Sequence, residues 1–320
     1  MRHKKIVWFG FLILMVVAVV GISQSYTFRN EIKQLRYLTN VHSFSSLHCL
    51  QLDRSTQVHF KSDQLTITGD LYPPASGVPS PCIILLHGSS LNGRKLPLMQ
   101  VMAAKFQQMN FMVLNIDLRG YGESDDPPAL TSPKDFNFAA DVIHAIDFLS
   151  KQPLADTSRI FLIGHSFGAG VALAAMQRDK RIKKLVLIGP PRRLRERFFQ
   201  DNSPDREYFL KRWQKDMQLS YPLPYDLWQA VYQPLDIENY LAKLSEAGHI
   251  PIMFIDGAKE DPADLQFLRR ITSQIAPPVT YWTVPDTDHY LNTGFFFSRV
   301  CYDSKIIGTL ISHIRNWITH

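Results

Sequence analysis

The 320-residue sequence is poor in cysteine, and its cysteines form no metal-binding motif. Cys49, Cys82 and Cys301 are far apart, and no two of them stand in a Cys-x-x-Cys arrangement. Three cysteines allow at most one intramolecular disulfide and leave one thiol over. Cys82 opens an apolar segment, as a small buried side chain would. The cysteines leave the redox compartment open, and we expect no metal site.

Motifs for nucleic-acid binding and for N-glycosylation are also missing. The formal net charge is +6 and the pI is about 9.1. However, Arg2, Lys4 and Lys5 supply part of this excess at the extreme N-terminus, and the only later basic cluster is 192–197. Charge in this arrangement, with no zinc-finger spacing, phosphate-binding loop or RNA-binding motif, does not indicate a nucleic-acid site. We therefore expect no nucleic-acid partner.

A long, almost uniformly apolar run stands at the N-terminus. Residues 6–22 carry no charge and follow a basic start. As a helix this run would be about 26 Å long, close to the ~30 Å hydrocarbon core of a bilayer. A cleavable signal peptide has the same plan with a shorter apolar core. We expect residues 1–25 to be a transmembrane anchor or a signal segment rather than a buried soluble helix.

The basic residues before this run favour an N-terminus in the cytoplasm. Arg29, Lys33 and Arg36, which follow it, partly balance that bias. The predicted localisation is a single-pass membrane protein with the remainder of the chain outside, in the periplasm or extracellular space. Secretion after signal cleavage is the alternative.

Short apolar runs alternate with helix-length segments from about residue 56 onward. Residues 26–55 are expected to be a connector, and 57–61 with 65–72 to form a hairpin. Strands that are apolar on both faces and alternate with helices indicate an α/β fold, a mostly parallel sheet covered by helices on both faces. The expected strands are 82–86, 112–116, 160–163, 185–188, 252–255 and 279–284, and the expected helices are 97–108, 136–149, 167–178 and 304–318.

The segment at about 190–249 breaks this alternation, because it has no good strand and many aromatic residues and prolines. We expect it to be an inserted helical lid within a domain that spans 56–320. Its basic cluster, Arg192, Arg193, Arg195 and Arg197, could bind a carboxylate, lie against anionic lipid or form a solvated helix face. Aromatic side chains here would line an apolar pocket or pack the lid onto the body: Phe198, Phe199, Tyr208, Phe209, Trp213, Tyr221, Tyr225, Trp228 and Tyr232.

The most informative motif is Gly164-His165-Ser166-Phe167-Gly168, which lies directly after an apolar strand and before a helix of small residues. A Gly-x-Ser-x-Gly motif in this context places the serine on a strained strand-to-helix turn. The flanking glycines leave room for the backbone crossing, and the helix N-terminus offers N–H groups to negative charge. Ser166 is therefore the predicted nucleophile.

With this motif the sequence resembles the α/β-hydrolase family. In that family an early strand ends in His-Gly, and the next backbone N–H helps to form the oxyanion hole. Here the corresponding residues are His87-Gly88-Ser89, so the resemblance implies that the amides of Ser89 and Phe167 are the oxyanion donors. Residues 117–124 resemble the family's Asp-x-Arg-Gly-x-Gly-x-Ser turn, in which Asp117 and Arg119 would brace a loop.

The resemblance also implies the acid and the base, because the family order is nucleophile, acid, histidine. Asp256-Gly257-Ala-Lys-Glu-Asp261 is similar to the family's Gly-x-x-Asp loop and indicates Asp261 as the acid. Asp256 and Asp264 are weaker candidates. His289, in the loop before the last helix, is the predicted base.

Together these residues predict a serine hydrolase that cleaves a carboxylic ester-type bond through an acyl-enzyme. A thioesterase, amidase or lipase would use the same triad, and a membrane-tethered binding domain without turnover is the alternative from another class. The expected partner is a small-molecule acyl substrate, in addition to the membrane. No cofactor, metal or obligatory protein partner is indicated.

Overall fold

The computed structural model describes residues 46–50, 55–127, 129–200, 205–217, 224–244, 250–276, 278–296 and 298–320. Its centre is an eight-stranded sheet of order β2-β3-β5-β4-β6-β7-β8-β9. β2 and β3 form the predicted antiparallel hairpin, β3 also runs antiparallel to β5, and the remaining neighbours are parallel. The strands are β2 (Thr56–Ser62), β3 (Leu65–Tyr72), β4 (Ser80–Leu86), β5 (Met112–Ile116), β6 (Ala155–His165), β7 (Ile182–Ile188), β8 (Ile252–Gly257) and β9 (Val279–Val284).

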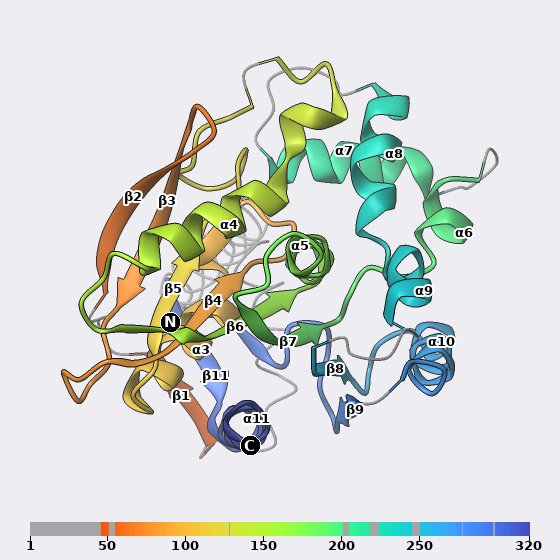
Figure 1. The fold of residues 1–320 in the computed structure, drawn as a ribbon. Helices are drawn as coiled ribbons and strands as arrows, with labels where there is room; N and C mark the ends of the chain where they lie inside the picture. The colour runs from red at the N-terminus through yellow and green to blue at the C-terminus, as the bar shows by residue number, and fades with distance from the viewer. Residues whose placement is uncertain are drawn as a thin grey trace, which may run out of the picture.

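Helices cover both faces of this sheet, as the apolar strands predict (Figure 1). One apolar core joins the sheet to α4 (Phe138–Leu149), α5 (Phe167–Met176) and α10 (Pro262–Thr272). The other joins the opposite face to α3 (Pro97–Gln108) and α11 (Ser304–Thr319). The fold class predicted from the sequence is confirmed.

The register of the central strands brings their carboxyl ends to one edge. Leu86 at the end of β4 pairs with Gly164 of β6, and Ile188 at the end of β7 pairs with both His165 and Ile255. Loops that leave these strands therefore start side by side. In open α/β sheets this edge is where ligands bind.

A helical segment lies between β7 and β8, where the sequence predicts an interruption of the alternation. Its described residues contain helices and no strand. Its buried apolar side chains belong to the same apolar core as α4 and α5, and Figure 1 shows α7 and α8 together, with α9 nearer to α10. The elements are α6 (Leu194–Phe198), α7 (Arg206–Asp216), α8 (Tyr225–Tyr232), α9 (Leu241–Leu244) and the short 3₁₀ helices η4 (Gln233–Leu235) and η5 (Ile237–Tyr240). We call residues 190–251 the inserted segment.

A second, three-stranded antiparallel sheet has the order β1-β11-β10. β1 (Leu47–Cys49) lies in the part of the chain predicted to be a connector, and it pairs with β11 (Arg299–Asp303), which also pairs with β10 (Thr293–Phe296). Cys49 and Cys301 are register partners and form a disulfide, while Cys82 is a free, buried thiol. This sheet fastens the start of the described chain to the C-terminal part of the domain.

The predicted membrane localisation needs correction. Among the described residues, no helix combines the length and the apolar character that crossing a bilayer requires. This finding contradicts the single-pass topology inferred from the sequence. The run 6–22 on which that inference rested lies outside the described residues.

Candidate active site

Ser166 occupies the sharp turn between β6 and α5. Its backbone has φ 51° and ψ −118°, a conformation that a non-glycine residue rarely adopts, and its N–H donates to Ile188 O at 2.7 Å. The flanking residues must be glycines because a side chain at either position would clash with nearby backbone atoms. A Cβ on Gly164 would lie 2.4 Å from Gly168 O, and a Cβ on Gly168 would lie 2.3 Å from Leu86 O. Strand, turn and helix therefore hold Ser166 as the motif predicts.

His289 lies in the loop between β9 and β10, and its Nδ1 is 2.5 Å from Glu260 Oε1. An ionised carboxylate only accepts hydrogen bonds, so Nδ1 carries the proton and Nε2 keeps its lone pair. The ring packs on Gly189 at the end of β7, where a Cβ would lie 2.7 Å from Cε1. Its backbone carbonyl is 2.8 Å from His165 Nε2. The contacts of the His289 ring with Glu260 and Gly189, and of its backbone with His165, thus fix the orientation of the imidazole.

The structure does not bring Asp261 to His289. The Asp261 side chain accepts from Ala263 N at 2.8 Å and is the N-cap of α10, with Pro262 in the first helical position. The preceding residue, Glu260, supplies the carboxylate on the histidine. A sequence signal for this arrangement was present, because Asp-Pro before a helix is typical of an N-cap followed by N1.

The ionisation of the groups around His289 suits a carboxylate beside a neutral imidazole. Burial raises the pKa of Glu260, but its hydrogen bond with His289 and the charge of Arg192 outweigh this and lower the pKa overall. Burial, together with the neighbouring His289, lowers the pKa of His165 to about 3. Glu260 is therefore ionised and His165 neutral at neutral pH.

Ser89 and Phe167, the predicted oxyanion residues, line the same cavity as Ser166 and His289. Phe167 is the first residue of α5, and Ser89 follows β4 by way of His87 and Gly88. His87 is buried under this loop. It accepts from Leu118 N at 3.1 Å through Nε2, so its Nδ1 donates to Gly88 O at 2.8 Å. His87 therefore has a structural role.

The inserted segment contacts the Ser89 loop directly. The Ser89 hydroxyl lies 3.1 Å from Asp216 Oδ2 and 3.2 Å from the hydroxyl of Tyr121. Trp213 Nε1 donates to the same Tyr121 hydroxyl at 2.5 Å. Because Trp213 and Asp216 both belong to α7, this helix is joined by hydrogen bonds to the loop beside the nucleophile. No pattern in the sequence indicates these contacts.

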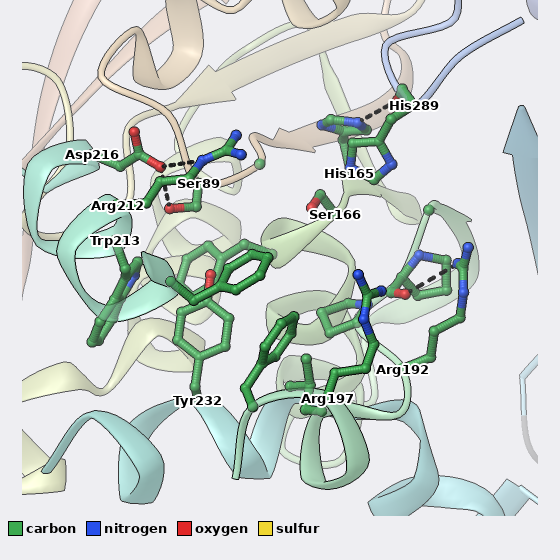
Figure 2. Close-up of a pocket in the computed structure, with 18 of the residues that line it drawn as sticks. Ser89, His165, Ser166, Arg192, Arg197, Arg212, Trp213, Asp216, Tyr232 and His289 are labelled. Atoms are coloured by element: carbon green, nitrogen blue, oxygen red, sulfur yellow. Dashed lines mark hydrogen bonds and ion pairs between the residues drawn. The ribbon is translucent and has the colours of Figure 1, made fainter. Parts of the chain in front are cut away.

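The cavity has a volume of about 400 Å³, which suits a small organic molecule. Figure 2 shows Ser166 between Ser89 on one side and His289 on the other, with side chains of the inserted segment opposite. The described residues contain no group of three or more His, Cys, Asp or Glu side chains that could hold a metal ion. The aromatic lining consists of Phe167, Phe198, Phe209, Trp213, Trp228, Tyr232 and Tyr290.

Comparison with known proteins establishes the family. The model of the alpha/beta hydrolase family matches residues 83–297, which include Ser166, Glu260 and His289, and the chain belongs to this family. A polyketide transferase of Stachybotrys chlorohalonatus is 34% identical over 134 residues, 42% of this chain and 43% of that protein. Esterase EstD of Thermotoga maritima is 27% identical over 150 residues, 44% of this chain and 35% of that protein.

The chain spans about two fifths of the length of the curated relatives that it matches first. Among solved structures, Est1E of Butyrivibrio proteoclasticus with ferulic acid bound has a TM-score of 0.59 at 14% identity, covering 82% of this chain and 98% of that one. At this identity the likeness concerns the fold. Family and relatives together support a hydrolase.

Proposed function

We propose that this α/β hydrolase is a serine hydrolase that cleaves carboxylic ester-type acyl bonds through Ser166, His289 and Glu260. One observation carries the proposal. Ser166, strained at its turn, and His289, hydrogen bonded to the partly buried Glu260 carboxylate, line one cavity. Nucleophile, base and orienting acid in this arrangement suit acyl transfer. Glu260 takes the role that the sequence assigned to Asp261.

In the proposed reaction, Ser166 Oγ attacks the acyl carbon while His289 Nε2 takes the hydroxyl proton. Glu260 holds the ring in the tautomer that leaves Nε2 unprotonated and stabilises the imidazolium that forms. Collapse breaks the acyl–oxygen bond, and the leaving alcohol takes the proton from Nε2. Water then attacks the acyl-enzyme by the same route and regenerates Ser166.

The amides of Ser89 and Phe167 are the proposed donors to the oxyanion. Such donors, already aimed at the developing charge, contribute about 3–4 kcal/mol each to transition-state stabilisation. The position of Phe167 at the N-terminus of α5 supports this role, because helix N-termini favour negative charge. The hydrogen bond between Ser89 and Asp216 would keep the loop in place.

The inserted segment is the proposed lid and acyl pocket. Phe198, Phe209 and Trp228 line the cavity beside aromatic residues of the body, which suits an apolar acyl or aryl group. Charges within the cavity wall are paired, as Arg197 with Asp264 at 2.7 Å shows. An uncharged acyl group is therefore the expected substrate class. Esters and thioesters of such acids share the same first step.

The first test is hydrolysis of a panel of aryl and short-chain acyl esters, with thioesters of the same acids. The wild type should hydrolyse at least one class, and Ser166→Ala should lose at least ~10³-fold in kcat, because no other side chain accepts the acyl group. Ser158→Ala, on an exposed part of the same strand β6, is the matched control. A folded Ser166→Ala protein with most of the wild-type rate would contradict the proposal.

A further inference from the structure

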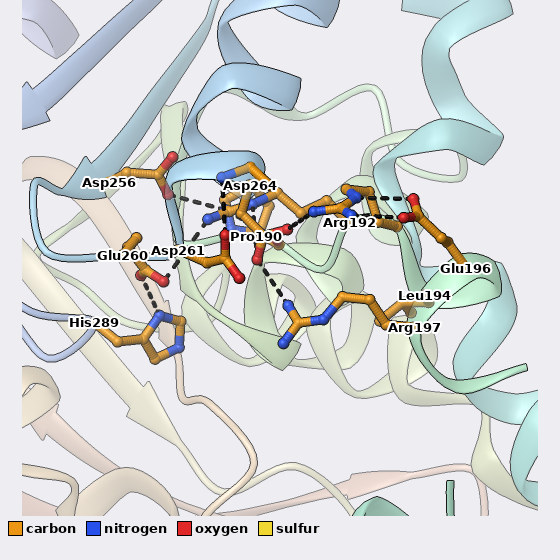
Figure 3. A network of polar contacts seen from close by, with 12 residues as sticks. Pro190, Arg192, Leu194, Glu196, Arg197, Asp256, Glu260, Asp261, Asp264 and His289 are labelled. Carbon is orange, nitrogen blue, oxygen red and sulfur yellow. Dashed lines mark hydrogen bonds and ion pairs between the residues drawn. The ribbon is translucent and has the colours of Figure 1, made fainter. Parts of the chain in front are cut away.

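Arg192 is a buried cation at the start of the inserted segment, four residues after β7 ends at Ile188. Its side chain is 4% exposed. Nη1 donates to Asp256 Oδ1 at 3.0 Å and to Pro190 O at 3.3 Å (Figure 3). Asp256, at the end of β8, is fully buried and also accepts from the Tyr281 hydroxyl at 3.2 Å. Arg192 is thus fixed between two neighbouring strands of the sheet.

The other end of the same guanidinium faces Glu260. Arg192 Nη2 lies 3.8 Å from Glu260 Oε2, while Glu260 Oε1 contacts His289 Nδ1 at 2.5 Å. The two oxygens of one carboxylate therefore have different partners, a cation on one side and the imidazole on the other. The planar, rigid guanidinium suits this position because it can serve two carboxylates at fixed angles.

The neighbouring arginines have other partners. Arg193 Nη1 and Arg197 Nη1 bind the two oxygens of Asp264 at 2.9 and 2.7 Å, and Arg193 also pairs with Glu196 at 2.6 Å. Arg192 Nε lies 3.9 Å from Asp264. Arg192 forms an ion pair with the carboxylate that contacts His289, whereas Arg193 and Arg197 pair with Asp264. Arg193 is therefore a matched control for Arg192: it is a neighbouring arginine with a different carboxylate partner.

We propose that Arg192 is a positioning residue for the catalytic acid: its guanidinium, anchored on Asp256, holds the Glu260 carboxylate against His289 Nδ1. The proposal rests on the proposed function of the triad. It differs from a structural role, in which Arg192 would only neutralise buried Asp256. It also means that a residue at the start of the inserted segment contributes to the geometry of the triad.

The charge of Arg192 should also influence protonation of the histidine. The charged and titratable groups near Glu260 are Arg192, Asp256, His165 and His289, and Asp264 lies near Arg192. The carboxylate contacts the ring at 2.5 Å, whereas the guanidinium contacts the carboxylate. A Glu260 carboxylate that leaves Nδ1 no longer stabilises the imidazolium. The acid limb of the pH profile of kcat/KM should then move to lower pH, because the protonated ring, which cannot act as base, forms less readily.

The experiment compares Arg192→Gln, Arg192→Lys and Arg193→Gln with the wild type. Arg192→Gln should lower kcat about 10–100-fold with a smaller change in KM, as misplacement of a reacting group does. Its acid limb should move to lower pH. Arg192→Lys keeps the charge, so its acid limb should stay in place and part of kcat should return. Arg193→Gln should change neither. Wild-type kcat and an unmoved acid limb in folded Arg192→Gln would overturn the proposal.

A readout without substrate separates this proposal from the proposed function. The proton between His289 Nδ1 and Glu260 gives a downfield NMR signal, which Glu260→Gln identifies by its loss. In Arg192→Gln this signal should shift or broaden, and in Arg193→Gln it should not. An inactive wild type with this pattern would refute the hydrolase but support the positioning role. An unchanged signal in Arg192→Gln would refute the positioning role.

Arg192→Gln leaves Asp256 buried beside a neutral partner and could prevent folding. The double variant Arg192→Gln/Asp256→Asn removes that buried charge as well. It should fold and still show the loss of kcat and the moved acid limb, because Glu260 remains without its guanidinium. Activity restored to the wild-type level in this double variant would show that Arg192 only compensates Asp256, which would overturn the proposal.

Discussion

Glu260 and Asp261 are neighbours in the chain with different surroundings. The Glu260 carboxylate is largely buried against His289 and Arg192, whereas the Asp261 carboxylate accepts from the free N–H of Ala263 in the first turn of α10. The longer glutamate side chain reaches across to the histidine loop from a position before the helix starts. We therefore assign the helix cap to Asp261 and the contact with His289 to Glu260.

Exchange of each carboxyl for an amide tests this assignment. Glu260→Gln should lower kcat by at least ~10²-fold, because an amide can stabilise the wrong tautomer of His289 and does not stabilise the imidazolium. Asp261→Asn should stay within about threefold of the wild type, because asparagine is an equally good N-cap. Steady-state kinetics on the best ester measures both.

Circular dichroism and thermal unfolding control for folding in these two variants. The reverse outcome, an inactive Asp261→Asn beside an active Glu260→Gln, would return the role of the acid to Asp261.

At the scale of elements, the inserted segment depends on a buried carboxyl. Asp236, 3% exposed between η4 and η5, accepts from Leu194 N at 2.6 Å and from Glu238 N at 2.9 Å. It thereby joins the start of α6 to η5. Burial raises its pKa to about 6, although both hydrogen bonds act in the opposite direction. Ionisation of this group therefore works against the folded state.

Because the pKa of Asp236 is higher in the folded than in the unfolded protein, this group stabilises the folded state fully at pH values below its unfolded pKa near 4. That contribution to the free energy of unfolding is lost as the pH rises through about 6. Asp236→Asn, which cannot ionise, should remove this loss. Relative to the variant, the wild type should lose roughly 1–3 kcal/mol of unfolding free energy between pH 4 and pH 7. Urea unfolding at several pH values measures the difference, with exposed Asp226→Asn as control. If the difference in unfolding free energy between the wild type and Asp236→Asn is the same from pH 4 to pH 7, ionisation of Asp236 does not destabilise the folded state and this prediction is wrong.

At the scale of the whole molecule, the sequence predicts the main sheet and much of the site for clear physical reasons. Strands apolar on both faces require cover on both faces, and a serine between two glycines at a strand-to-helix turn has few other uses. Both signals are local. The positions of Ser166 and His289 follow from chain order along such a sheet.

Other features depend on contacts between distant parts of the chain. Three cysteines allow three different pairings, and only the register of β1 with β11 selects Cys49 and Cys301, which are 252 residues apart. Composition likewise cannot show that Arg192 is buried whereas Arg195, three residues later, is exposed. The proposed assignment of the acid depends on where α10 begins. The helix-start signal at Asp261-Pro262 predicts that Asp261 is the N-cap, whereas the family pattern indicates it as the acid.

The central claim, that Ser166 is an activated nucleophile, is tested most directly by labelling with a fluorophosphonate and measurement of the intact mass. The reagent phosphonylates a serine whose proton is taken by a neighbouring base. We predict one adduct on the wild type and on Ser158→Ala, located in the peptide that contains Ser166, and none on Ser166→Ala. An unlabelled wild type, or equal labelling of Ser166→Ala, would contradict the account.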